Sequence, residues 1–153
     1  MWDSKDEYLL KGHEITTTSF AALSGNLQSA IQRGGLKEAI PFCNIQAPEL
    51  TDSLERLYSC EIRRTSLRYR NPENAPDTTE IRILKRYQDE MSRSKSLSPL
   101  VETSHNAIHY YQPILTAKLC LNCHGIVGEN LSLSNVSLIH SLYPFDQATG
   151  SID

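Results

Sequence analysis

Three scarce side chains of this 153-residue chain are spaced for one kind of chemistry, in the order Cys120, Cys123 and His124. The pattern Cys-x-x-Cys-His is typical of covalent attachment of a c-type haem. The two thiols add to the two vinyl groups of one porphyrin, so they must lie about one helical turn apart, and the following histidine lies under the iron. The motif therefore predicts one haem c, held covalently by Cys120 and Cys123, with His124 as an axial ligand.

Two other kinds of site also use a Cys-x-x-Cys pair. A structural zinc ion takes four ligands. A zinc site at this motif would need two further ligands from a second pair of cysteines or histidines, and we expect no such pair to join it. A thioredoxin-like redox pair begins a helix after a buried strand, whereas Lys118 and Leu119 before the motif form a poor strand. Haem attachment is therefore the preferred interpretation.

The composition is that of an ordinary globular domain, with 39% hydrophobic and 22% charged residues. A net charge of −3 argues against nucleic acid or an anionic membrane surface as the main partner. No apolar run is long enough to span a membrane. The sequence shows no signal peptide, although haem c is attached outside the cytoplasm. We therefore expect an extracytoplasmic location (periplasm or, in a cyanobacterium, lumen), with the signal peptide or anchor not included in these residues.

The elements that must position the motif follow from hydrophobic periodicity and from glycine and proline. Thr78 or Thr79 is expected to cap the fourth helix, and Pro48 to begin the third. The expected helices are 6–32, 36–44, 48–58, 78–92 and a last one that begins at Ser132 or Ser134 and ends at Leu142. The expected strands are 60–70, 100–103 and 107–111. The pattern predicts an α+β fold in one domain over 1–153, with an N-terminal helix within 1–33 and a sheet and haem-attachment region over 60–150.

Further motifs accompany the Cys-x-x-Cys-His pattern. They are Arg-Thr-Ser-Leu-Arg at 64–68, Arg-Asn-Pro-Glu-Asn-Ala-Pro-Asp at 70–77, Tyr-Gln-Pro-Ile at 111–114 and Tyr-Pro-Phe-Asp-x-Ala-x-Gly at 143–150. With these motifs in this order, the chain from about Phe20 to Gly150 resembles the Tll0287-like family of haem-c-binding domains, also known as DUF3365. The resemblance implies a PAS-like fold, in which helices flank an antiparallel sheet that carries one covalent haem. It also implies a sensory or redox role outside the cytoplasm.

The resemblance also implies a second axial ligand. The founding cyanobacterial member of the family carries a cysteine thiolate there, from a segment that matches residues 43–48 of this chain, so Cys43 is expected to bind the iron opposite His124. Family members continue into a Gly-Asp-Leu-Arg-Gly strand, whereas this sequence ends at Asp153. The last edge of the sheet and any homodimer are therefore left open.

The residue types alone leave other arrangements open at the sixth position of the iron. Cys43 on the inner face of a helix could be a small buried hydrophobe, or could pair with Cys60 in a disulfide, which would prevent ligation. Cys60 is otherwise expected to be a structural thiol. The remaining alternatives are His13, His105, His109, His140, Met91 or no ligand.

Four arginines lie between residues 63 and 70, where a positive run is ordinarily a solvated face. A haem brings two propionates, which alternate arginines on a strand can bind through paired donors. Matching to the family pattern selects Arg64 and Arg68 for this role over Arg63 and Arg70.

These expectations favour a monohaem cytochrome that acts as a redox or gas sensor. A thiolate ligand stabilises ferric iron and lowers the reduction potential, and its loss on reduction would open the iron to CO, NO or O₂. The alternative is a small low-potential electron carrier that exchanges electrons with an unidentified protein partner. An enzyme such as a peroxidase is not expected, because no distal His–Arg arrangement is evident and a filled sixth site opposes turnover.

Overall fold

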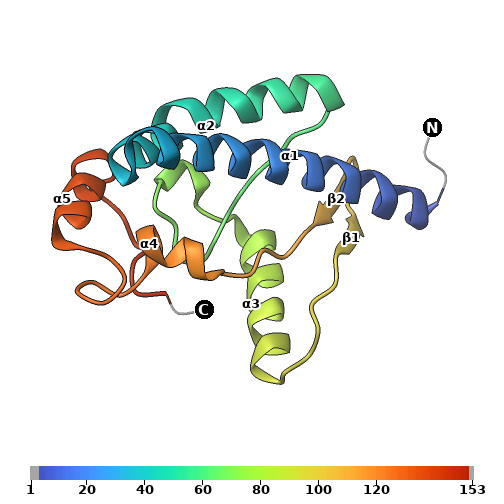
Figure 1. Cartoon of the computed structure of the whole chain (residues 1–153). Helices are drawn as coiled ribbons and strands as arrows, with labels where there is room; N and C mark the ends of the chain where they lie inside the picture. The colour runs from blue at the N-terminus through green and yellow to red at the C-terminus, as the bar shows by residue number, and fades with distance from the viewer. Residues whose placement is uncertain (1–3, 152–153) are drawn as a thin grey trace.

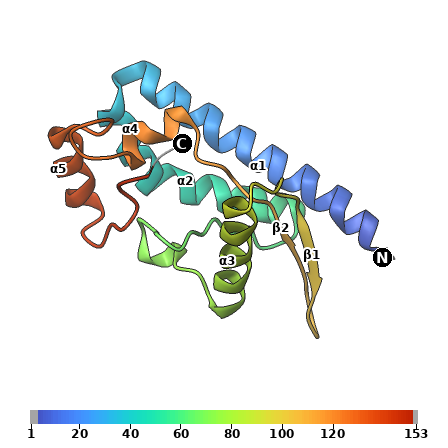
Figure 2. The same ribbon diagram turned by 90° about the horizontal axis from the view of Figure 1, so that it is seen from below.

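Two long antiparallel helices, α1 (Lys5–Gly34) and α2 (Leu36–Tyr58), lie side by side in the computed structural model, which describes residues 4–151 (Figures 1 and 2). Ser4 begins α1 with a capping box shared with Glu7. Gly35, with φ of 68°, forms the turn because glycine adopts this conformation without strain. The N-terminal helix expected from the sequence is confirmed, and residues 1–3 of the predicted region lie outside the described part.

The prediction of two separate helices between residues 36 and 58 is wrong. The structure has one continuous α2, with Pro41 and Pro48 inside it. Each proline removes a backbone donor and disfavours the helix. Burial of Ala39, Ile40 and Leu54 on α2 outweighs that cost, because the helix packs along α1 and against α5 (Leu133–Leu142).

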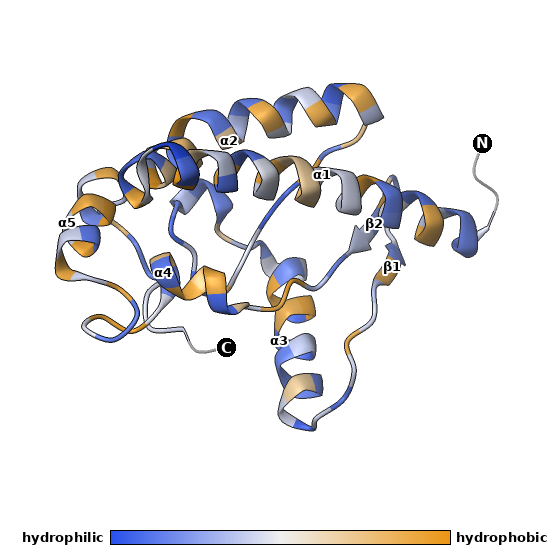
Figure 3. Ribbon diagram, in the orientation of Figure 1, coloured by the Kyte–Doolittle hydropathy of each residue, from blue (hydrophilic) through white to orange (hydrophobic). Residues whose placement is uncertain are grey.

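The hydrophobic core lies where α2 meets α5. Ile40, Leu131, Ile139 and Tyr143 form one buried cluster. Both α2 and α5 carry orange, hydrophobic segments in Figure 3. A second cluster of Ala30, Ala39 and Phe42 lies between α1 and α2. The predicted helix before Leu142 is confirmed as α5, with Ser132 as its N-cap. The side chain of Ser132 accepts a hydrogen bond from the Asn135 amide.

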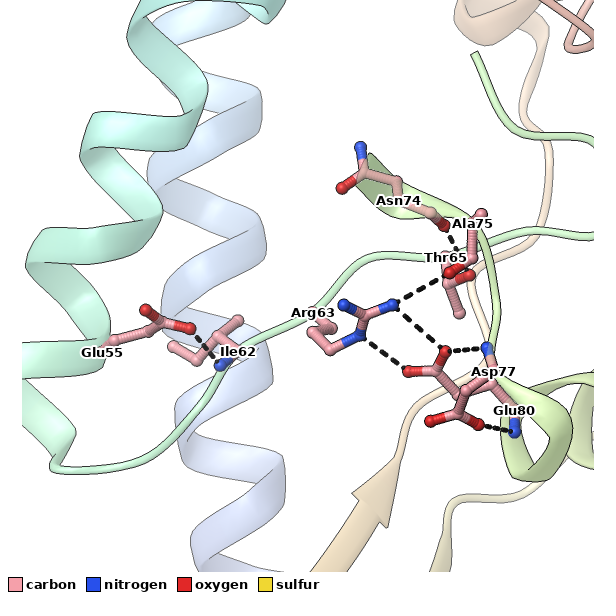
Figure 4. A network of polar contacts seen from close by, with 8 residues as sticks. All are labelled: Glu55, Ile62, Arg63, Thr65, Asn74, Ala75, Asp77 and Glu80. Carbon is pink, nitrogen blue, oxygen red and sulfur yellow. Dashed lines mark hydrogen bonds and ion pairs between the residues drawn. The ribbon is translucent and has the colours of Figure 1, made fainter. Parts of the chain in front are cut away.

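The predicted strand over 60–70 is wrong, since this segment has no regular secondary structure. Its polar groups bond to loops and side chains instead of a neighbouring strand (Figure 4). Arg63 pairs with Glu80 at 2.9 Å and donates to the Ala75 carbonyl at 3.0 Å. The Thr65 hydroxyl donates to the carbonyl of Asn74, within the short 3-10 helix η1 (Pro72–Asn74).

Helix α3 (Thr78–Ser92) forms where a charged helix is predicted, but its cap is Asp77 rather than Thr78 or Thr79. The Asp77 carboxylate accepts from the Glu80 amide at 2.8 Å, and the Asp77 amide donates to the Glu80 carboxylate at 2.8 Å. Aspartate is the stronger capping residue, because its charged oxygen also interacts favourably with the helix dipole. Tyr87 is buried and donates its hydroxyl to the Ser98 carbonyl at 2.8 Å.

The predicted hairpin is confirmed as β1 (Leu100–Thr103) paired antiparallel with β2 (Ile108–Tyr111), with Leu100 opposite Tyr111. The hairpin packs on the N-terminal half of α1 (Figure 1). The α+β class is confirmed. The wider PAS-like sheet is not, because residues 4–151 contain no strand beyond these two. No helix in this part of the chain is long and apolar enough to cross a membrane.

Candidate functional site

The Cys-x-x-Cys-His motif forms a short helical segment. Cys120 ends the 3-10 helix η2 (Lys118–Cys120), and Cys123 and His124 belong to α4 (Leu121–His124). The helical backbone of Cys120, with φ of −65° and ψ of −28°, places the two cysteines about one turn apart. Leu121 between them is buried and anchors the segment. Both cysteines are half-buried free thiols, as attachment to a porphyrin requires.

The His124 ring is held by its Nδ1 atom, which lies 2.9 Å from the Ala148 carbonyl oxygen. A carbonyl oxygen can only accept a hydrogen bond, so Nδ1 carries the proton and Nε2 presents its lone pair. Burial lowers the pKa of His124, and the nearby Arg70 charge lowers it further, which favours a neutral ring. A neutral imidazole with Nδ1–H bonded to a carbonyl is the usual form of a metal-binding histidine.

Cys43 in α2 lies near the motif, although the two are far apart in the sequence. Its thiol interacts electrostatically with Cys123 and with Tyr143. The residue is exposed, yet the surrounding protein shields part of its thiol from water. This partial burial raises the pKa of the thiol, while the charges of Arg64 and Arg70 oppose that rise. The structure therefore brings the predicted second ligand to the side of the molecule that carries the motif.

Cys60 lies elsewhere, just past the C-terminal end of α2, where Glu55 and Lys11 influence its thiol. All four cysteines of the chain are free thiols. The disulfide between Cys43 and Cys60, the alternative that would have prevented ligation, is not formed.

The other candidate ligands lie on other elements of the fold. His13 lies exposed on α1, His105 lies in the hairpin turn, and His140 is exposed on α5. His109 stacks on Tyr111 at 6.2 Å between ring centroids. Met91 is exposed near the end of α3. Within the described residues no group of three or more histidine, cysteine or acidic side chains is arranged to hold a metal ion.

The four arginines of the 63–70 segment have different partners. Arg63 is held by Glu80, as described above. Arg64 is exposed, makes no hydrogen bond or ion pair within residues 4–151, and directs its charge toward Cys43 and His124. Arg68 donates Nε to the Gln147 carbonyl at 3.1 Å and Nη2 to the Thr149 carbonyl. The donors of Arg64 therefore have no protein partner in residues 4–151, whereas two donors of Arg68 hold the C-terminal segment.

Arg70, which the sequence interpretation set aside, contacts the motif directly. Its Nη2 donates to the Cys123 carbonyl at 2.6 Å, and its Nε pairs with Asp146 at 2.9 Å. Its position at the start of the Arg-Asn-Pro run was visible in the sequence. Its partners lie 53 and 76 residues away along the chain, so no local pattern could reveal them.

A surface depression lies apart from this cluster, between α1 and α2. Its lining residues are Asn26, Phe42, Gln46, Glu49, Leu50 and Ser53. None of these residues belongs to the motif, and none contributes a charge or a thiol that acts on Cys123 or His124. We therefore assign the site to the cluster around the motif, whose free thiols, neutral imidazole and nearby Cys43 form a donor set that fits a covalent haem.

Comparisons with known proteins identify a family and a related structure. A family model described as Tll0287-like matches residues 4–150. A solved structure, described as the crystal structure of the cyanobacterial heme-protein Tll0287, matches with a TM-score of 0.68 and 18% sequence identity. That match covers 98% of this chain and 89% of the other, and at this identity it shows a shared fold. A search of curated proteins finds no match.

Proposed function

The chain belongs to the Tll0287-like family, and from this premise we propose that it is a haem-binding, cytochrome-like protein whose haem is attached at Cys120 and Cys123. The observation that carries the proposal is the His124 ring, whose Nδ1–H bond to the Ala148 carbonyl leaves Nε2 available beside two free thiols. Bound haem supplies a one-electron redox couple and a coordination position for a diatomic gas. Since attachment of haem c occurs outside the cytoplasm, we infer an extracytoplasmic location.

The residues of the site have distinct tasks in this proposal. The thiols of Cys120 and Cys123 would add across the two vinyl groups, so that an S–H bond and a vinyl π bond are replaced each time by a C–S and a C–H bond. His124 would hold the iron through Nε2, and Cys43 would supply a second ligand as a thiolate. Cys43 must lose its proton to do so, which the positive charges of Arg64 and Arg70 favour. Arg64 is the better placed of the two predicted propionate ligands.

We infer a redox or gas sensor rather than an enzyme. A thiolate at Cys43 stabilises the oxidised iron. Protonation of Cys43 after reduction would release it from the iron, and the haem would then supply a position for CO, NO or O₂. The electron-carrier alternative rests on the single attachment motif in a small chain of net charge −3 and on the exposed Leu119 beside the motif, through which electrons could pass. An unidentified protein partner is required in both cases.

The first experiment tests attachment. The protein is expressed with a c-type haem maturation system, and the pyridine haemochrome spectrum measures covalent haem per chain. We expect about one haem per chain, reduced in Cys120→Ala and Cys123→Ala and unchanged in Cys60→Ala, the matched control. Wild-type protein without covalent haem would contradict the proposal.

The second experiment tests the ligands and separates the two functions. Absorption and EPR spectra of ferric and dithionite-reduced protein are compared for the wild type, Cys43→Ala and Cys60→Ala. We expect low-spin thiolate character in the ferric wild type and in Cys60→Ala, lost in Cys43→Ala, and CO binding by the reduced wild type. Reduced protein that stays six-coordinate and refuses CO would favour electron transfer. Unchanged Cys43→Ala spectra would exclude Cys43 as the ligand.

A further inference from the structure

A buried ion pair joins two segments that both contact the haem-attachment motif. Arg70 and Asp146 are 13% and 0% exposed, and their Nε and Oδ1 atoms lie 2.9 Å apart. A buried pair has an energetic cost in desolvation, so it contributes to stability only when further hydrogen bonds complete it. Arg70 makes a further bond to the Cys123 carbonyl, and Asp146 Oδ1 accepts a second bond from the Ala148 amide at 2.9 Å, while the buried Oδ2 of Asp146 has no hydrogen-bond partner in residues 4–151.

These contacts close a ring of interactions around His124. The ring runs from the Cys123 carbonyl through Arg70 to Asp146, then through the Ala148 amide to the Ala148 carbonyl, which accepts the His124 Nδ1–H bond. The ring closes at His124, the residue that follows Cys123 in the sequence. Each contact in the ring is between 2.6 and 2.9 Å. A displacement of Arg70 or Asp146 therefore shifts the His124 imidazole through contacts within the polypeptide alone.

Backbone bonds hold the same C-terminal segment against the motif. The Gly150 amide donates to the Gly125 carbonyl at 2.8 Å, and the Ser151 amide donates to the His124 carbonyl at 2.7 Å. The segment ends beside α4 in both views (Figures 1 and 2). Residues 143–151 thus form a strap across the back of the motif, and Asp146 is its charged attachment point.

We propose that Arg70 and Asp146 are positioning residues that set the tautomer and orientation of the His124 imidazole through this strap. The proposal rests on the proposed function in so far as His124 binds iron, but the ring of contacts belongs to the polypeptide itself. Without Asp146, the Ala148 carbonyl loses its support and Nδ1 loses a fixed acceptor. Support of this kind keeps a ligating histidine basic and correctly turned.

The test compares Asp146→Asn and Arg70→Lys with the wild type. Asparagine keeps the shape of Asp146 and removes its charge, and lysine keeps the charge of Arg70 but cannot bridge both partners. The matched controls are Glu102→Gln and Arg82→Lys, because Arg82 and Glu102 form an ion pair that is more exposed, on α3 and the hairpin. If Asp146→Asn does not fold, Arg70→Lys carries the same test.

Two measurements do not need the haem. ¹⁵N NMR of the His124 ring reports its tautomer, and hydrogen exchange reports the amides of Ala148, Gly150 and Ser151. We expect the Nδ1–H form to decrease and exchange of these amides to become about tenfold faster or more in both variants, with α1 amides and both controls unchanged. An unchanged ring signal, or faster exchange spread equally over the whole chain, would overturn the proposal.

A third measurement uses the haem-loaded protein. Loss of the Nδ1–H bond makes His124 a weaker donor to oxidised iron, so the reduction potential of both variants should rise above that of the wild type and the controls. An unchanged potential would count against the positioning role. Wild-type protein that takes up no haem would refute the proposed function, while the ring and exchange measurements would still decide this inference.

Discussion

His124 and the motif cysteines lie together because they are neighbours in the sequence. The arginines of the 63–70 segment instead obtain their partners from other segments that fold back against them. Arg63 bonds to Glu80 and to the Ala75 carbonyl, and Arg70 bonds to Asp146 and to the Cys123 carbonyl. Both belong to the same short segment and to the same residue type. Among the four arginines of this segment, Arg64 alone has no hydrogen bond or ion pair within residues 4–151, and its charge acts on Cys43.

Gly12 of α1 offers a test at the same scale, because the Tyr110 ring of β2 lies where a side chain would be. A Cβ at Gly12 would overlap the ring carbons of Tyr110, whereas a Cβ at Gly25 meets nothing within 4 Å. We expect Gly12→Ala to lower the free energy of unfolding by about 1–3 kcal/mol through overpacking. Gly25→Ala, the matched control in the same helix, should raise it by up to about 1 kcal/mol.

Urea unfolding of both variants at equal haem content checks this prediction. Equal effects of the two substitutions would contradict the packing of β2 on α1.

Helix α2 is the element on which the site depends most, because it carries Cys43 and forms the core with α5. It stays helical through Pro41 and Pro48. A proline at the first turn of a helix costs nothing, but one in the interior costs about 3 kcal/mol relative to alanine. The two interior prolines therefore lower the stability of α2, and this loss of folding free energy can be measured.

We expect Pro48→Ala to raise the free energy of unfolding by about 2 kcal/mol, since the restored amide bond outweighs the greater entropy of the unfolded chain. Urea unfolding measures this change. If a separate helix began at Pro48, the substitution would be neutral or slightly destabilising. Pro72→Ala is the control, because Pro72 lies at the start of η1, where a proline loses no helical bond.

At the scale of the whole molecule, two buried tyrosines lie in different parts of the fold, and the pKa of each phenol depends on its burial. Tyr87 joins α3 to the segment before β1, and Tyr143 belongs to the core between α2 and α5. Burial raises the pKa of each phenol to about 12. In the unfolded chain a phenol loses its proton near pH 10.

The folded state therefore retains these protons at a pH where the unfolded state has released them, so the free energy of unfolding falls as pH rises from about 10 to about 12. Below pH 10 the contribution is fully present. We expect a weaker fall in Tyr87→Phe and in Tyr143→Phe, measured by chemical unfolding across this range. Variants with the same slope as the wild type would show that these phenols are not protected.

Much of the fold was predictable where the determining contacts are local. The helix over 6–32, the hairpin over 100–111 and the helix ending at Leu142 follow from periodicity, caps and turn residues, and the structure has all three. The motif residues were predictable for the same reason, since one helical turn relates Cys120 to Cys123 and chain adjacency adds His124. The proximity of Cys43 was expected only from the family resemblance.

The remaining features depended on contacts between residues far apart in the sequence. The β-branched and alternating pattern of 60–70 favoured a strand. In the structure the polar groups of this segment bond to carboxylates and carbonyls, and no neighbouring strand within residues 4–151 pairs with it. Burial against α5 kept α2 helical through its prolines, and Arg70 acquired its role from Asp146. The sequence by itself therefore determined the attachment motif and the local elements, because their interactions lie within a few residues. Tertiary structure alone decided the charge partners and the support of His124, because those interactions exist only after distant segments have packed together.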